Sequence, residues 1–377
     1  MKYRSLSLAL LVLAACGDSN VDVAPVAEPV SVRLATIEST PDLSGSFTDC
    51  RLDYDVSGNL HVAYRFESGT GSAELRYAVN TSGEWRTDSV GQFTSMQRSF
   101  DIAVENRQPR ILFAASRGSS DELIDANLEF DGEWSEEAIL TGIGDLDPLR
   151  LASNSVANEV RAVIPPTGTE FFRDASIRFG DWQVEPVGRA PLGGSVLGFD
   201  MAIDRFGDPH ACVTSNTAEG QILFYGQIVD DEWTFEEAYR ERLAARCRIG
   251  VDRDGLIRIG AMEQTIAQNE IILLEQGRAR WERTGIAIAT FGDFDMVTGS
   301  DGSITFSWID ATSRELVLAP SVTAFEQQRL SEANAGSSAS LALSPDGSIA
   351  FCSEFRDVTE QRVITGIVPR PTAPPSQ

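Results

Sequence analysis

The side chains best suited to chemistry in this sequence form a series of arginines and aspartates that recurs every 45 to 50 residues. The series reads Arg51, Asp101, Arg150, Asp200, Arg248, Asp295 and Ser340. Guanidinium and carboxylate groups form strong, charge-assisted hydrogen bonds, so the series has two interpretations. It forms either a structural girdle of ion pairs, which we favour, or the mouth of a channel that receives a polar ligand. Because Ser340 breaks the alternation of charge, Arg51 lacks an acidic neighbour on one side and is the strongest candidate for binding a ligand carboxylate.

Groups for proton transfer and covalent catalysis are scarce. The two histidines, His61 and His210, each follow a glycine by three residues, and we expect them to make structural hydrogen bonds from a strand to a turn. Lys2 is the single lysine, which leaves no candidate for a Schiff base or a phosphate-loop cation in the mature chain. The cysteine and histidine spacings match no zinc motif. We therefore predict no catalytic residue, metal or cofactor, although activity stays open.

The charge balance limits the partners. Aspartate and glutamate number 56 against 31 lysines and arginines, which gives a formal net charge of −25. A surface this acidic repels phosphate backbones, so we predict no nucleic-acid partner. Hydrophobic residues make up 42% of the chain, which is typical of a globular protein with a core.

The N-terminus predicts export. Lys2 and Arg4 precede an apolar run over residues 6–13, which is too short to span a bilayer and is typical of a signal peptide over residues 1–15. The ending Leu13-Ala14-Ala15-Cys16 resembles the lipobox of bacterial lipoproteins, which implies lipidation of Cys16 and a membrane anchor. The alternative is an ordinary signal with a coincidental cysteine. We expect a lipidated tether over residues 16–30 and a location on a periplasmic face or cell surface, with the choice of membrane left open.

One unit repeats through the rest of the chain. A tryptophan recurs at intervals of 48 to 51 residues, and Phe325 continues this series. The tryptophans are Trp85, Trp134, Trp182, Trp233 and Trp281. A turn glycine recurs as well, at Gly58, Gly207, Gly255, Gly302 and Gly347. Such a period is typical of a β-propeller, and we expect the tryptophans to fill the core between blades.

Each unit contains four segments with strand character. In the fourth unit the segments are Phe199–Asp204, Pro209–Thr214, Gln221–Val229 and Trp233–Ala238. The seventh unit, Ala339–Val368, supplies three strands, and the orphan segment Ser31–Ile37 supplies the fourth. We therefore predict an all-β, seven-bladed propeller over residues 31–368, with four-stranded blades and the N-terminal strand completing the last blade. Residues 369–377 read as a disordered tail.

The remaining cysteines occupy related positions in the repeat. Cys50 and Cys247 each precede a turn glycine by eight residues, and Cys212 and Cys352 each follow one by five. Of the three possible connectivities, only Cys50–Cys352 and Cys212–Cys247 join neighbouring blades in the predicted ring. Disulfides are compatible with an oxidising compartment. The alternative is four buried free thiols.

The segment from Asp55 to Tyr64, followed by Leu75-Arg76-Tyr77-Ala78 and Gly83-Glu84-Trp85, resembles BNR-like (sialidase-type) propeller repeats of bacterial surface proteins. The Ser-x-Asp-x-Gly-x-x-Trp box of sialidases is not reproduced, and neither their arginine triad nor their Tyr-Glu pair can be assigned. Similar propellers include polysaccharide lyases, and that resemblance implies His61 and Tyr64 as candidates. The resemblance therefore implies the fold rather than an activity.

Three functions remain. The first is a lipid-anchored, non-catalytic module of the cell envelope that binds a protein or a glycan. The second is a glycan-active enzyme, either a glycoside hydrolase or a polysaccharide lyase. The third is an envelope-assembly scaffold that presents loop edges to partner strands.

Overall fold

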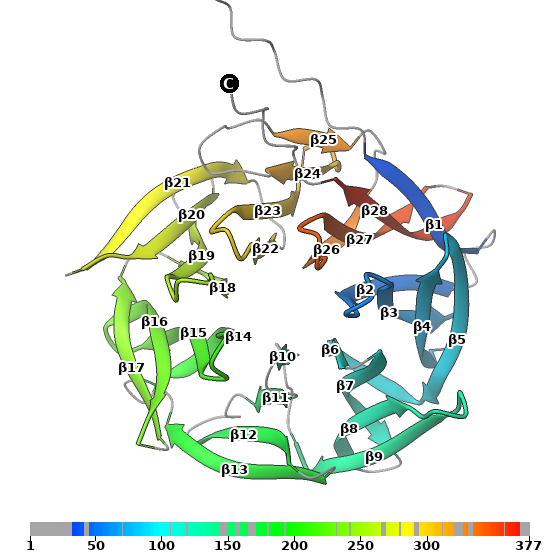
Figure 1. The fold of residues 1–377 in the computed structure, drawn as a ribbon, viewed down its shortest axis with the longest axis horizontal. Helices are drawn as coiled ribbons and strands as arrows, with labels where there is room; N and C mark the ends of the chain where they lie inside the picture. The colour runs from blue at the N-terminus through cyan, green and yellow to red at the C-terminus, as the bar shows by residue number, and fades with distance from the viewer. Residues whose placement is uncertain are drawn as a thin grey trace, which may run out of the picture.

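The protein is a ring of seven four-stranded sheets around a central axis (Figure 1). The computed structural model describes residues 32–369 except 41–44, 70, 106, 118–119, 144–148, 155–158, 165–170, 179–180, 190, 192–193, 231, 241–242, 265–268, 279, 290–293, 311, 320–326, 331–334 and 358. The predicted signal peptide, Cys16, the tether, Ser31, Phe325 and residues 370–377 lie outside this part. No helix among the described residues is long and apolar enough to cross a bilayer. The predicted all-β, seven-bladed architecture is confirmed.

The first four blades follow the chain from the centre outward. Blade 1 contains β2 (Gly45–Tyr54), β3 (Leu60–Ser68), β4 (Ala73–Thr81) and β5 (Glu84–Phe93). Blade 2 contains β6 (Ser95–Glu105), β7 (Gln108–Arg117), β8 (Ser120–Leu128) and β9 (Trp134–Thr141). Blade 3 contains β10 (Arg150–Asn154), β11 (Glu159–Ile164), β12 (Phe171–Arg178) and β13 (Asp181–Arg189). Blade 4 contains β14 (Ser195–Ile203), β15 (Pro209–Thr217), β16 (Gly220–Val229) and β17 (Glu232–Tyr239).

The other three blades repeat this order, except for the outermost strand of the last. Blade 5 contains β18 (Leu243–Val251), β19 (Ile257–Gln264), β20 (Asn269–Gln276) and β21 (Trp281–Ala289). Blade 6 contains β22 (Phe294–Thr298), β23 (Ile304–Ile309), β24 (Leu316–Ala319) and β25 (Gln328–Leu330). Blade 7 contains β26 (Ala335–Leu343), β27 (Ile349–Arg356), β28 (Gln361–Val368) and β1 (Arg33–Thr40).

The turn glycines mark the hairpins between the first two strands of a blade. In blade 1, the Gly58 N–H donates to the Asp55 carbonyl at 3.0 Å, and an Asp55 carboxylate oxygen accepts the Asn59 N–H at 2.8 Å. Gly58 has a φ of 80°, a conformation that glycine adopts without steric cost. The four other predicted turn glycines also have positive φ values, between 81° and 93°. In these five blades the first strand therefore ends in the same type of hairpin turn.

The ring closes through the two ends of the described chain. Strand β1 pairs antiparallel with β28, from Arg33 opposite Ile367 to Thr40 opposite Gln361. The chain's first strand therefore completes blade 7, as predicted, although it extends to Thr40 rather than ending at Ile37. Cys50–Cys352 joins blades 1 and 7 and Cys212–Cys247 joins blades 4 and 5, which is the predicted pairing. Two disulfides are consistent with an extracellular or periplasmic protein.

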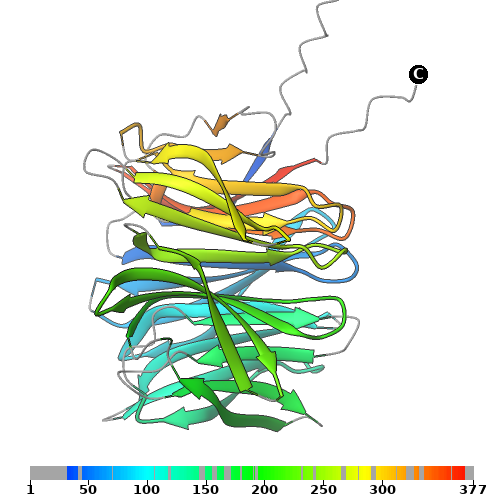
Figure 2. The ribbon, with the colours of Figure 1, turned by 90° about the vertical axis from the view of Figure 1, so that its left-hand side faces the viewer.

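The core lies between blades, seen edge-on as stacked layers in Figure 2. Val62, Ala63 and Tyr64 on β3 are successive residues and all fully buried, because each blade packs against a neighbour on both faces. Trp233 is 6% exposed and packs in the cluster between blades 3 and 4, and Trp281 packs against the cluster that contains Cys212. These two repeated tryptophans serve the interblade core, as predicted.

Candidate functional site

A cavity of about 350 Å³ lies on the ring axis, where the innermost strands of all seven blades meet. These strands are β2, β6, β10, β14, β18, β22 and β26. All seven members of the predicted series line this cavity, one from each blade. The repeat therefore placed the series correctly around one central space, and its ligand-binding role stays a prediction.

The three arginines are held in the same pose. In each, one terminal guanidinium nitrogen (Nη1) donates to the carbonyl oxygen of the preceding residue. The distance is 2.8 Å from Arg51 to Cys50, 3.1 Å from Arg150 to Leu149, and 3.0 Å from Arg248 to Cys247. Two of these carbonyls belong to disulfide cysteines, so the crosslinked backbone holds the guanidinium groups of Arg51 and Arg248.

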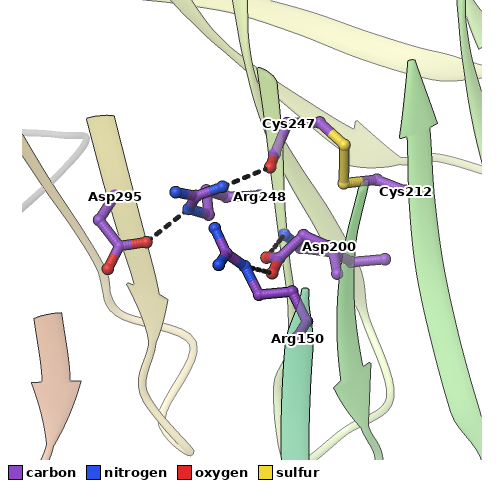
Figure 3. Close-up of a disulfide and its surroundings, with 7 residues drawn as sticks. Arg150, Asp200, Cys212, Cys247, Arg248 and Asp295 are labelled. Atoms are coloured by element: carbon purple, nitrogen blue, oxygen red, sulfur yellow. Dashed lines mark hydrogen bonds and ion pairs between the residues drawn. A yellow bond between two sulfur atoms is a disulfide. The ribbon is translucent and has the colours of Figure 1, made fainter. Parts of the chain in front are cut away.

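Two of the arginines form ion pairs between neighbouring blades. Arg150 Nε lies 2.9 Å from Asp200 Oδ1, and Arg248 Nε lies 2.6 Å from Asp295 Oδ1 (Figure 3). Both arginine residues are less than 9% exposed. For these four residues the structure supports the interpretation as a girdle, with charges that neutralise one another away from water.

The aspartates of the series also bind backbone. Asp101, Asp200 and Asp295 each accept the N–H of a residue on the innermost strand of the next blade. The donors are Leu151, Ile249 and Leu341, at 2.9, 2.9 and 2.8 Å. An innermost strand is a sheet edge, and these carboxylates satisfy N–H groups that the sheet leaves without a partner. The series therefore ties blades 2 to 7 into a continuous chain of contacts.

Blade 1 departs from this pattern. The carboxylate that binds the next blade is Asp53, whose Oδ2 accepts the Val104 N–H at 2.9 Å and whose Oδ1 accepts the Tyr54 N–H at 2.8 Å. Asp53 lines the cavity, and sequence reasoning missed it. The available signal was its position two residues after Arg51 in a strand, which places both side chains on the same face.

Among the described residues, Arg51 is the arginine of the series that forms no ion pair. Where Arg150 and Arg248 contact the aspartate of the next blade, Asp101 Oδ1 instead accepts the Ile102 N–H at 3.0 Å. Within the described part of the chain, Arg51 has no carboxylate at ion-pair distance, and its guanidinium carbon lies 6.0 Å from the Phe100 ring centroid. Ser340 is 5% exposed, and its hydroxyl has no hydrogen-bond partner among the described residues. Arg51 and Ser340 therefore both have hydrogen-bond donors at the cavity that bind no other described residue.

Burial controls the electrostatics of the cavity. It raises the pKa of Asp101 and Asp200 above the usual range, against the opposing effect of the neighbouring arginines. Burial lowers the pKa of Arg150, and the charges of Arg248 and Arg51 lower it further. The three guanidinium groups therefore act on one another, and the site can attract an anion where a carboxylate does not already neutralise them.

The histidines lie away from this cavity. His61 Nδ1 is 2.6 Å from the Tyr77 hydroxyl and His210 Nδ1 is 2.7 Å from the Tyr225 hydroxyl, and burial lowers the pKa of both imidazoles. The hydrogen bond of each imidazole reaches a tyrosine on the third strand rather than the predicted turn, and the other ring nitrogen, Nε2, faces the turn carboxylate at ion-pair distance. The turn carboxylates lie farther away, at 3.7 Å for Asp55 and 3.8 Å for Asp204.

The pair implied by the resemblance to lyases does not form one site. Tyr64 is three residues beyond His61 on β3, so the two side chains lie on opposite faces of the sheet. The Tyr64 hydroxyl donates to Glu38 Oε2 on β1 at 2.6 Å, whereas His61 binds Tyr77. No group of three or more potential metal ligands occurs in the described residues.

Comparison with known proteins identifies the fold. No family model and no curated protein matches the sequence. The structure resembles a polysaccharide lyase, Uly1, with a TM-score of 0.55 and 9% identity over 86% of this chain and 89% of the lyase. It also resembles the β-propeller domain of the Trilobed protease from Pyrococcus furiosus, with a TM-score of 0.51 and 13% identity over 85% and 93%. A protein of unknown function from Dyadobacter fermentans is similar as well, with a TM-score of 0.51 and 10% identity over 89% of this chain and 98% of that protein. These likenesses show the propeller fold.

Proposed function

We propose that this protein is a non-catalytic binding module of the cell envelope that recognises a carboxylate-bearing glycan in its central cavity. The observation that carries the proposal is Arg51, a cavity-lining arginine held by its own backbone and without a carboxylate partner among the described residues. Arg51 can offer two further N–H groups to a ligand carboxylate, and the Ser340 hydroxyl is available beside it. A hydrogen bond to a charged group contributes about 1.5–3 kcal/mol.

The cavity offers binding rather than reaction chemistry. Its four carboxylates belong to Asp53, Asp101, Asp200 and Asp295, and each accepts a backbone N–H from the next blade. An acid or base that is already committed to holding the ring together is poorly placed to approach a substrate. A glycan remains the first class of ligand to test, because the fold is shared with a polysaccharide lyase. A hydrolase or lyase activity is the rival outcome of the same experiment.

We also propose the export and membrane anchoring that the sequence predicts. Residues 1–15 would be removed as a signal peptide, Cys16 would be lipidated, residues 16–30 would connect the anchor to the propeller over 31–368, and residues 369–377 would form a tail. The two disulfides support an exported protein. Replacement of Cys16 by alanine should release the protein from the membrane fraction, and unchanged membrane association would contradict lipid anchoring.

Binding can be measured by calorimetry with the full chain and D-glucuronate at pH 6, with D-glucose as the uncharged comparison. We expect glucuronate alone to bind, and Arg51→Gln to weaken binding about 100-fold, which corresponds to about 3 kcal/mol. Arg33→Gln is the matched control, because it removes the same charge from an exposed position on β1. Equal effects of the two substitutions would refute the assignment of Arg51. Cleavage of glucuronate-containing oligosaccharides would favour the enzyme instead.

A further inference from the structure

Apolar side chains lie directly beside the charged series. The residue that follows each member of the series is a leucine, an isoleucine or a methionine, and all of these residues line the central cavity. We call them the apolar ring: Leu52, Ile102, Leu151, Met201, Ile249, Met296 and Leu341. The cavity is therefore lined by a charged ring and an apolar ring, which are one residue apart along every innermost strand.

The packing of the apolar ring leaves a part of each member at the cavity. Successive residues of a strand point to opposite faces, so each member of the apolar ring points away from the blade that the charged residue before it contacts. Each member belongs to a different hydrophobic cluster between two blades. The members are 4–8% exposed, whereas Phe100, Phe199 and Phe294, two residues earlier on the same strands, are at most 1% exposed. The apolar ring is therefore the place where the interblade cores reach the ring axis.

Arg51 lies against the part of blade 2 that carries a member of the apolar ring. Its guanidinium carbon is 6.0 Å from the centroid of the Phe100 ring on β6. Phe100 and Ile102 are alternate residues of β6, so they share one face of the strand, and both pack in the cluster between blades 1 and 2. A carboxylate bound by Arg51 would therefore lie at a junction that also presents apolar surface.

We propose that the cavity selects acidic sugars that carry an apolar group, such as an O-alkyl, O-aryl or N-acyl substituent, over acidic sugars that are polar throughout. The inference rests on the proposed function, because it names the class of ligand for the same site. The ligand carboxylate would bind Arg51, and the substituent would cover the apolar ring and remove its remaining surface from water.

The cavity also has space for such a substituent. In four blades the residue after the apolar ring is an alanine that lines the cavity, namely Ala103, Ala152, Ala202 and Ala342. These short side chains leave the apolar ring accessible from the axis. The cavity volume of about 350 Å³ lies at the lower end of the range for small-molecule sites, which suits one substituted sugar.

The expected preference follows from the apolar surface that the ligand covers. Transfer of one methyl-sized group from water to an apolar contact changes an equilibrium about fourfold. Methyl β-D-glucuronide should therefore bind about fourfold more tightly than D-glucuronate, and phenyl β-D-glucuronide, which offers several such groups, more than about tenfold more tightly. Phenyl β-D-glucoside has the same apolar group without the carboxylate, and it should bind about 100-fold more weakly than phenyl glucuronide.

The test is calorimetry of these four compounds with the full chain at pH 6. We expect phenyl glucuronide to bind most tightly, followed by methyl glucuronide and then glucuronate. Equal affinities of the three acids would overturn the inference and leave the proposed function standing. If phenyl glucoside binds as tightly as phenyl glucuronide, or if none of the four compounds binds, both the inference and the proposed function are wrong.

A pair of matched variants tests the contact itself. Ile102 and Ile304 are both 4% exposed, but Ile304 begins β23 in blade 6 and does not line the cavity. Ile102→Thr should reduce the preference for phenyl glucuronide over glucuronate about fourfold, the effect of one apolar contact, whereas Ile304→Thr should leave the preference unchanged. An unchanged preference in Ile102→Thr, or an equal reduction in both variants, would overturn the inference.

A further measurement does not depend on the folding of a variant. Burial of apolar surface makes the heat-capacity change of binding negative. Titrations of the unaltered protein at several temperatures should therefore give a more negative heat-capacity change for phenyl glucuronide than for D-glucuronate. Equal heat-capacity changes for the two ligands would show that the phenyl group stays in water, and this would overturn the inference.

Discussion

The two disulfides allow a direct test of how the ring is stabilised. Cys50–Cys352 closes a loop of 302 residues, whereas Cys212–Cys247 closes a loop of 35. All four cysteines are at most 1% exposed, so replacement of either pair by alanine removes the same buried atoms. The paired variants Cys50→Ala/Cys352→Ala and Cys212→Ala/Cys247→Ala are therefore matched, and they differ chiefly in the length of the chain that each crosslink restricts.

The chain-entropy model gives the expected difference. A crosslink lowers the entropy of the unfolded chain by an amount that grows with the logarithm of loop length, which corresponds to about 6 kcal/mol for the ring-closing disulfide and about 4 kcal/mol for the local one. We therefore expect the Cys50/Cys352 variant to lose about 2 kcal/mol more in the free energy of unfolding. After this loss, the pairing of β1 with β28 must hold the ring closed without the disulfide between blades 1 and 7.

Urea unfolding followed by tryptophan fluorescence measures both losses, with the unaltered protein treated identically. Coincidence with the transition seen by circular dichroism would establish that one cooperative unit unfolds. Equal losses would show that the stabilisation does not come from restricting the unfolded chain. A greater loss for the Cys212/Cys247 variant would refute the reasoning altogether.

Three further predictions concern buried charges. Asp200→Asn leaves Arg150 buried without its counter-charge and should cost about 3–5 kcal/mol in urea unfolding. Arg51→Gln removes no ion pair within the described part of the chain and should cost less than about 1 kcal/mol, so similar costs would contradict the pairing. Burial lowers the pKa of His61 and His210, so the stability that these neutral side chains contribute is complete above about pH 6.5 and is lost as the pH falls. In unfolding measured from pH 7 to pH 5, the double substitution His61→Phe/His210→Phe should therefore reduce this loss of stability. Asp53 acts in the opposite direction, because its pKa is raised from 3.8 to about 7. Its contribution to the free energy of unfolding is therefore complete below about pH 4 and is lost as the pH rises through 7. A dependence of stability on pH that is unchanged by Asp53→Asn would contradict this.

The architecture could be predicted because each unit repeats the same physical solution. The turn glycines recur since each hairpin needs a backbone conformation that glycine adopts easily, and the tryptophans recur since each pair of blades needs a large side chain in its core. The disulfides followed from the same repeat, because cysteines at corresponding positions of neighbouring blades face one another. Ring closure followed from the three-stranded last unit and the orphan segment before the first.

The departures from the repeat could not be predicted in this way. Asp53 performs in blade 1 the task that Asp101, Asp200 and Asp295 perform in other blades, but it stands two residues farther along its strand. The bond between His61 and Tyr77 depends on a diagonal contact between strands, which a count along the sequence does not give. A repeat predicts what the blades share, whereas a binding site depends on how one blade differs.

The number of blades explains where that difference falls. Positive and negative charges can alternate without interruption around a closed ring only if the number of positions is even. This ring has seven positions, and the alternation ends at Ser340, next to Arg51. Had the ring contained six or eight blades, each arginine could have had an aspartate on both sides. The seven-bladed ring instead leaves one junction without a matching charge, between blades 7 and 1, where the chain also closes and Cys50 is bonded to Cys352. The odd ring thus leaves Arg51 without an acidic neighbour on the side of blade 7, while on the side of blade 2 Asp101 Oδ1 accepts the Ile102 N–H instead of pairing with Arg51. The carboxylate of a ligand is the group that would complete this junction.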